Sequence, residues 1–275
     1  MEIQVFTMDS FTNLPFKGNP AAVCPLAHEL NDDLYQKIAA EMNLSETAFV
    51  TPINPSDTFT SGKFICSKCS HARHSLSSVL SPSENINPTL VFETRSGDLA
   101  VSKKKDGYLM DFPLNPPTQD PKEFKDFIRV TVGNLPVQGV FLNTNMRKLM
   151  IRLSDSCDRA MLTGLNVDPT TLLAIENEGK VKGIIVTVKG SADHQPGYDF
   201  YSRNFSPWFG IPEDPVTGST HTILGSYWSK ELGKTKMLAY QCSSRGGELE
   251  LEVRDDGRIN IGGEVVTVLQ GIIRL

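Results

Sequence analysis

The chain has 275 residues, of which 39% are hydrophobic and 21% charged, and its formal net charge is -5. This is the composition of a globular protein with enough apolar material for one large domain or two of ordinary size. The negative net charge argues against a surface that binds nucleic acid. The sequence has no run of about 18 apolar residues that could span a membrane. The first residues lack a basic region followed by an apolar run, so we expect a cytoplasmic protein whose five cysteines are free thiols.

The first half of the chain alternates strands with one clear helix. Residues 1–9 are predicted to form a strand, and Gly18-Asn19-Pro20 is a turn signal before a second apolar stretch. Residues 31–42 have an Asn/Asp N-cap and helical spacing of apolar side chains, and residues 45–52 alternate as a strand does. The stretch 89–114 then predicts an antiparallel meander with turns at Ser-Gly-Asp and Asp-Gly.

The second half repeats this order after a proline-rich boundary at residues 112–124. The repetition predicts two similar α/β halves, residues 1–115 and 116–275, with a cleft between them. The expected elements are strands at 137–142, 148–153, 183–190 and 198–205, helices at 168–176 and after residue 217, and a hairpin at 247–263.

The segment 198–233 carries the strongest local signal. Thr217-Gly218-Ser219-Thr220 opens a predicted helix that ends near Gly233. Small residues in a first turn leave backbone N–H groups accessible, and the helix dipole adds positive charge, so this helix start suits a carboxylate or an oxyanion. Asp214 would lie beside it. The alternative interpretation is an ordinary capped helix with Asp214 as an outlying cap.

Three motifs resemble the phenazine-biosynthesis isomerase (PhzF-like) family: FKGNPAAV, MNLSETAFV and EDPVTGSTH. The resemblance covers nearly the whole chain and keeps the motifs in order. It implies an α+β fold similar to diaminopimelate epimerase, with two pseudo-symmetric halves, each a curved, mostly antiparallel sheet around a central helix. It also implies an active site between the halves, a homodimer, and no requirement for a metal or organic cofactor.

By this resemblance, the chemistry is proton transfer between carbons of a small carboxylated substrate. Glu46 would be the general acid/base, which requires a carboxyl group that is partly buried. Asp214 would orient the substrate or act as the partner acid/base, and Gly218 and Ser219 would hold its carboxylate. On pattern alone, the favoured interpretation of Glu46 is a surface residue at a helix-to-strand junction.

Three further residues have weaker assignments. Asn19 is expected to shape the floor of the cleft through backbone geometry. Tyr201, with Arg203, lies on the strand before the second-half helix, and one face of that strand should look into the cleft. His221 is interpreted as a packing or capping residue.

Residues 66–75 read CSKCSHARHS and allow three interpretations. A zinc site is disfavoured because its four ligands would fall in one short segment, and a redox Cys-x-x-Cys pair lacks its usual context. The third interpretation is an altered active-site segment, in which His71 is the counterpart of the family's active-site histidine. Residues 60–87 depart from the family pattern, and we expect them to be locally irregular.

The sequence therefore predicts a cofactor-independent isomerase that acts on a small carboxylate-bearing molecule, with Glu46, Asp214 and His71 as catalytic residues. Gly218, Ser219, Asn19 and Tyr201 are the predicted substrate-binding residues, and no metal, nucleic acid or membrane is expected. The alternative is an inactive family member that binds a ligand or a protein, and the altered segment 60–87 favours it.

Overall fold

The computed structural model describes residues 1–44, 46–54, 63–67, 87–94, 97–118, 124–175, 178–191 and 197–275. The chain forms two compact units. Unit 1 contains Met1–Phe112 and Asn260–Leu275, and unit 2 contains Pro113–Ile259. This division differs from the expected halves 1–115 and 116–275, because the last strand of the chain pairs with the first strand.

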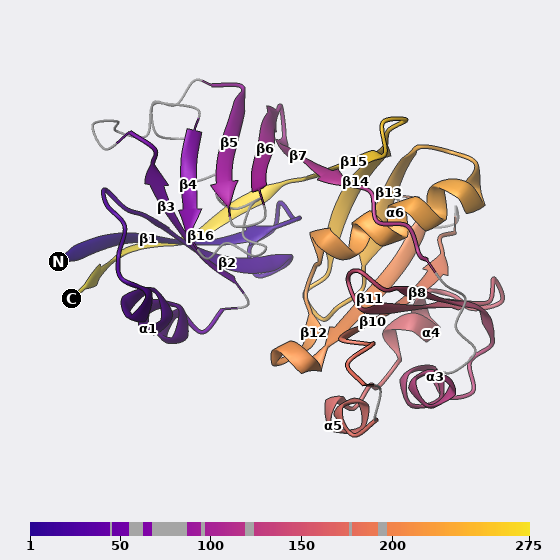
Figure 1. The fold of residues 1–275 in the computed structure, drawn as a ribbon. Helices are drawn as coiled ribbons and strands as arrows, with labels where there is room; N and C mark the ends of the chain where they lie inside the picture. Colours follow the sequence, from indigo (N-terminus) through magenta and orange to yellow (C-terminus); the bar gives the residue numbers. More distant parts are fainter. Residues whose placement is uncertain are drawn as a thin grey trace. The chain divides into compact units, whose positions relative to one another are not determined.

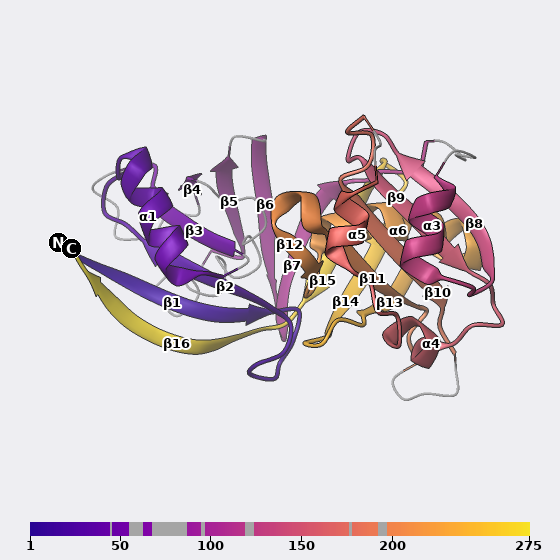
Figure 2. The same ribbon diagram turned by 90° about the horizontal axis from the view of Figure 1, so that it is seen from below.

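Unit 1 is a sheet with the strand order β16-β1-β2-β3-β4-β5-β6-β7. Its neighbours are antiparallel except at β2–β3 and β4–β5. Figure 2 shows β1 and β16 side by side, with the two ends of the chain together. The strands are β1 (Glu2–Ser10), β2 (Asn19–Pro25), β3 (Glu46–Pro52), β4 (Lys63–Ser67), β5 (Thr89–Thr94), β6 (Gly97–Lys104), β7 (Gly107–Pro113) and β16 (Val265–Arg274).

Helix α1 (Asp32–Met42) begins and ends as its sequence predicts. The Asn31 side chain accepts a hydrogen bond from the Leu34 amide at 2.8 Å, which satisfies one of the free N–H groups of the first turn. Asn43 ends the helix in the left-handed conformation. The buried face of α1 presents Tyr35, whose ring lies 4.6 Å from that of Phe49, so the helix covers one face of β3.

In unit 2 the strands pair in the order β15-β14-β13-β11-β10-β9-β8, and β12 adds to β11. The pairs β9–β10 and β11–β13 are parallel. The strands are β8 (Val137–Asn143), β9 (Lys148–Leu153), β10 (Gly183–Lys189), β11 (Phe200–Ser206), β12 (Ile211–Asp214), β13 (Lys236–Gln241), β14 (Gly247–Val253) and β15 (Arg258–Gly263), at which the chain returns to unit 1. The helices are α3 (Lys125–Val132), α4 (Arg159–Thr163), α5 (Pro169–Leu173), the 3-10 turn η1 (Pro207–Phe209) and α6 (Gly218–Leu232).

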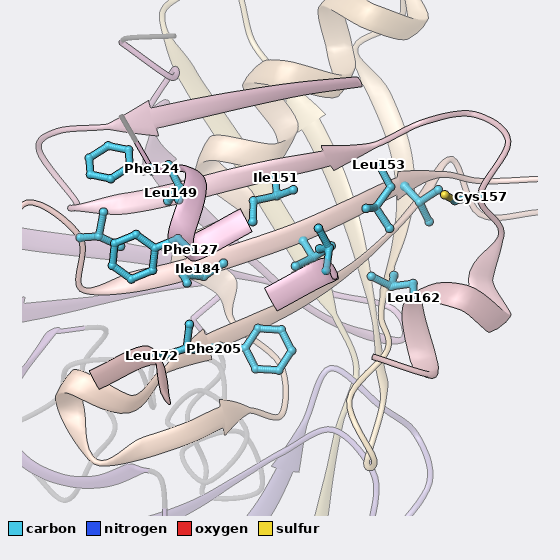
Figure 3. Close-up of a cluster of buried hydrophobic side chains, with 14 of the residues drawn as sticks. Phe124, Phe127, Leu149, Ile151, Leu153, Cys157, Leu162, Leu172, Ile184 and Phe205 are labelled. Atoms are coloured by element: carbon cyan, nitrogen blue, oxygen red, sulfur yellow. The ribbon is translucent and has the colours of Figure 1, made fainter. Parts of the chain in front are cut away.

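Helices cover both faces of the sheet in unit 2 (Figure 1). The ring of Trp228 on α6 stacks on Phe200 of β11, with centroids 5.4 Å apart, and its N–H donates to Thr187 of β10 at 3.0 Å. The opposite face carries an apolar cluster from α3, α4, α5 and the strands, which includes Phe127, Leu162, Leu172, Ile184 and Phe205 (Figure 3). Burial on both faces explains why strands such as GIIVTVK are almost continuously apolar.

The structure adds elements that the sequence did not indicate, chiefly α3, α4 and β16. Part of the segment 60–87 is described, and there residues 63–67 form β4, which pairs with β3. Cys24, Cys157 and Cys242 are free thiols, but Cys66 is disulfide-bonded, so the expectation of a free thiol is wrong at this residue. In the part of the chain that the structure describes, no helix is long and apolar enough to cross a membrane.

Candidate functional site

Glu46 is a buried carboxylate in unit 1. It begins β3 and is 8% exposed, in a strand whose other residues are mostly apolar and buried. Because side chains alternate along a strand, Glu46 shares a face with Ala48 and Val50. Phe49 packs on the other face against α1, so Glu46 points away from that helix.

Asn19 lies on the same face of the sheet as Glu46. It begins β2 and is 5% exposed. Asn19 is two residues before Ala21, which pairs with Glu46, so both side chains point to the same face. The backbone before it requires glycine, because Gly18 has φ +63° and a Cβ there would lie 2.1 Å from the carbonyl oxygen of Ser10. Asn19 and Glu46 are therefore brought together within unit 1 by strand register.

The start of α6 in unit 2 is built as the sequence suggested. Thr217 is the N-cap residue in an extended conformation, and Gly218 and Ser219 form the first turn, both half-buried. The Thr217 side chain makes no capping hydrogen bond to this helix, because its hydroxyl is turned toward Asp214 instead. The first backbone N–H groups and the positive end of the helix dipole can thus serve an anion.

Asp214 is held beside this helix start by two side chains. Its Oδ2 accepts a hydrogen bond from Oγ1 of Thr217 at 2.5 Å, and its backbone carbonyl accepts one from Nε2 of Gln241 at 2.7 Å. Oε1 of Gln241 in turn accepts from the Thr217 amide at 2.9 Å. Asp214, Gly218 and Ser219 are therefore brought together within unit 2, with Gln241 as a residue that the sequence did not single out.

A lysine that the sequence did not single out also reaches this network. Lys148 on β9 is 9% exposed, and its Nζ donates to Oγ1 of Thr220 at 2.6 Å and to Oδ1 of Asn204 at 3.2 Å. Burial lowers the pKa of Lys148 to about 8, and the negative charge of Asp214 partly opposes that effect. A lysine that begins a mostly apolar strand is the only trace of this in the sequence.

His221 is a packing residue, as the sequence suggested. It is fully buried, its ring lies 6.0 Å from that of Phe200, and its Nδ1 is 2.8 Å from the carbonyl oxygen of Thr217. Burial lowers the pKa of His221 to about 4, so the ring is neutral at physiological pH. Its role is to hold the first turn of α6.

Tyr201 and Arg203 lie on the other face of β11 from α6. Tyr201 is 1% exposed within the apolar cluster of unit 2. Arg203 forms a two-pronged ion pair with Glu213, at 2.7 and 2.8 Å, and donates to the carbonyl oxygen of Leu165. The structure therefore does not bring Tyr201 together with the α6 start, and the face of β11 that does reach it carries Asn204.

His71 and most of the stretch 66–75 lie outside the described residues. Within the described ranges, no three histidine, cysteine or acidic side chains gather as a metal site would require.

Comparison with known proteins identifies the family of this chain. The model of the family described as "Phenazine biosynthesis-like protein" (PhzC-PhzF) matches residues 8–271. The chain belongs to this family. The phenazine biosynthesis-like domain-containing proteins of Rattus norvegicus and Homo sapiens are 47% and 46% identical to it, each over 99% of both chains. An uncharacterized isomerase of Halalkalibacterium halodurans is 37% identical over the full length of both chains.

Solved structures confirm the expected α+β fold. A PhzF-family protein of Enterococcus faecalis matches with a TM-score of 0.86 and 33% identity, covering 100% of both chains. A hydroxyproline epimerase of Agrobacterium vitis matches with a TM-score of 0.52 and 11% identity, covering 99% of this chain and 91% of its own. At that identity the second match shows the fold alone. The PhzF-family chain thus has an isomerase- and epimerase-like fold.

Proposed function

We propose that this protein moves a proton between carbons of a small carboxylate-bearing molecule, with Glu46 as the general acid/base. The observation that carries the proposal is the burial of Glu46, 8% exposed, in a PhzF-family chain with relatives named as isomerases. Acidic side chains are rarely buried this deeply without a role in pairing or chemistry. A carboxylate removed from bulk water is a suitable carrier for a proton that must be taken and then returned.

The proposed step conserves atoms and electrons. Glu46 takes a proton from a carbon next to the substrate's carbonyl or carboxylate group, and the electron pair of the broken C–H bond delocalises toward oxygen. The proton then returns from Glu46 to another carbon, while the Asp214 carboxylate orients the substrate. The amides of Gly218 and Ser219, at the positive end of α6, would stabilise the negative charge on the substrate's oxygen atoms. Asn19 would support the position of Glu46.

The proposal is tested by deuterium exchange on a panel of unsaturated and amino carboxylates in D₂O, followed by mass spectrometry. We expect at least one compound to gain deuterium with the wild-type protein and to lose that gain with Glu46→Gln. The matched control is Glu41→Gln, which changes an exposed glutamate of α1 in the same unit. Exchange that survives in Glu46→Gln would contradict the assignment of Glu46.

The alternative function is ligand or protein binding without turnover. It is favoured by the sequence of residues 60–87, which departs from the family pattern at the place of the catalytic histidine, His71. Calorimetric titration with the same panel separates the two functions. Binding that depends on Ser219 and Gly218, without deuterium exchange in any compound, would support the binder.

Three further properties belong to the same proposal. The reaction would need no metal or organic cofactor, because Glu46 would supply the acid/base chemistry. The protein would act in the cytoplasm as a homodimer, and its partner would be a small molecule and not nucleic acid or membrane. Activity after exhaustive chelation tests the absence of a metal requirement, and the mass in solution tests the homodimer.

A further inference from the structure

The side chain of Lys148 crosses two neighbouring strands of unit 2. Its side chain starts on β9, passes Gly183 on β10, and ends at Asn204 on β11. A Cβ at Gly183 would lie 3.4 Å from Cγ and 3.5 Å from Cε of Lys148, and 3.2 Å from Oγ of Ser206. A Cβ at Gly183 would therefore be in ordinary contact with the lysine stem and tight only against Ser206, which shows that the stem passes directly over Gly183.

The ammonium group begins a hydrogen-bond chain with a single direction. Nζ of Lys148 donates to Oδ1 of Asn204 at 3.2 Å, and Nδ2 of Asn204 donates to Oγ1 of Thr217 at 3.1 Å. Oγ1 of Thr217 then donates to Oδ2 of Asp214 at 2.5 Å. Each group donates a hydrogen bond to the next group, so the chain runs from the ammonium of Lys148 to the carboxyl group of Asp214.

The Thr217 hydroxyl fixes this direction. It accepts N–H groups from Asn204 and from Gln241, the latter at 3.3 Å, so its one hydrogen is left for Asp214. Oδ2 of Asp214 must therefore be an acceptor, and an ionised carboxylate offers an acceptor on each of its two oxygens. A protonated oxygen at that position would compete with the hydroxyl hydrogen.

We propose that Lys148 is a positioning residue which, through Asn204 and Thr217, holds Asp214 ionised and in place at the start of α6. It touches no substrate in this role. The effect of Lys148 on activity rests on the proposed function, in which Asp214 belongs to the substrate site. The coupling between Lys148 and Asp214 is a property of unit 2 alone.

The charged groups around Lys148 support a measurable coupling. Among the described residues, Asp214 on β12 attracts the ammonium, and His221 on α6 is kept neutral by burial. The groups that β10 and β11 present are Gly183, Asn204 and Ser206, none of which titrates. Deprotonation of Lys148, at a pH of about 8, would therefore remove the cation from the chain while His221 stays unchanged.

The test is carboxyl NMR on the complete protein labelled with ¹³C at aspartate, with Asp214 assigned from the spectrum of Asp214→Asn. We expect the Asp214 resonance of the wild type to inflect at about pH 8, together with the Cε resonance of Lys148. In Lys148→Met the inflection disappears, and the protonation midpoint of Asp214 rises by about half a pH unit or more, because an attractive charge has been removed. Lys236→Met, at an exposed lysine of the same unit, leaves both unchanged.

The wild-type curve alone decides the proposal if Lys148→Met fails to fold. An Asp214 resonance that does not respond when Lys148 loses its proton would overturn the coupling, as would an unchanged midpoint in a folded Lys148→Met. No substrate enters this measurement. Coupling without deuterium exchange would refute the proposed function alone, whereas exchange without coupling would refute this inference alone.

Discussion

Helix α6 lies so close to the sheet at Gly225 that a methyl group added there would require the Ile259 side chain to move. A Cβ at Gly225 would be 2.4 Å from Cδ1 of Ile259 on β15, and Ile259 is fully buried. Gly225→Ala should gain about 1 kcal/mol of helix propensity but lose about 1–3 kcal/mol through overpacking, so we expect a net loss of about 1 kcal/mol in the free energy of unfolding.

Ile259→Val removes the atom that the new methyl group would meet. Alone it should cost about 0.5–1.5 kcal/mol. In that background Gly225→Ala should become neutral or stabilising, which gives a favourable coupling energy of about 1–2 kcal/mol between the two sites.

Urea denaturation of the four proteins of this cycle, followed by tryptophan fluorescence, measures the coupling. Both tryptophans, Trp208 and Trp228, belong to unit 2, so the signal reports the unit that carries the substitutions. Equal destabilisation by Gly225→Ala in both backgrounds would refute the argument that the contact with Ile259 sets the cost.

Three other outcomes follow from the structure. Between pH 8 and 10.5 the unfolded chain binds more protons at Lys148 than the native state does, so the stability of the wild type over Lys148→Met should rise by about 3 kcal/mol across that range. Arg203→Met should cost about 3–5 kcal/mol because Glu213 loses a buried partner, and a double variant with Glu213→Leu should recover part of this loss. Asn31→Ala should destabilise α1 by about 1 kcal/mol through the lost bond to Leu34, visible as faster hydrogen exchange in its first turn.

Each of these outcomes has a result that contradicts it. A stability difference for Lys148→Met that stays flat or falls as the pH rises would show that the buried amine keeps an ordinary pKa. A double variant no more stable than Arg203→Met would show that the unpaired Glu213 is not the source of the cost. Unchanged exchange in Asn31→Ala would mean that the cap contributes nothing to α1.

The parts of the fold that the sequence predicted are those specified locally. Helix α1 follows from a capping asparagine and an apolar spacing within a dozen residues, and the meander β5-β6-β7 follows from turn residues between short strands. The start of α6 is equally local, because Thr217-Gly218-Ser219 is both the motif and the structure.

Elements that depend on distant packing were not predictable in the same way. Helix α3 contains Val130, Thr131 and Val132, which have low helix propensity, and it is held by Phe127 against the apolar cluster. The pairing of β16 with β1 joins residues about as far apart as the chain allows, with Glu2 opposite Arg274.

The candidate site also combines residues that are neighbours in the sequence with residues that are brought together only by folding. Asp214, Gly218 and Ser219 are neighbours in the sequence, and their proximity was foreseeable. Lys148 is 56 residues from Asn204, so no local pattern connects them. Alternation along β11 predicts that Tyr201 and Asn204 face opposite sides, but only the position of α6 decides which side meets the helix start.

The return of the chain to its first strand has a consequence for biosynthesis. Unit 2 is an uninterrupted segment, Pro113–Ile259, whereas unit 1 needs both Met1–Phe112 and Asn260–Leu275. On a translating ribosome the middle of the polypeptide can therefore complete its contacts while β1 still lacks a neighbour on one edge. An exposed strand edge is prone to pair with other chains, so nascent molecules should depend on chaperone protection until β16 has left the exit tunnel.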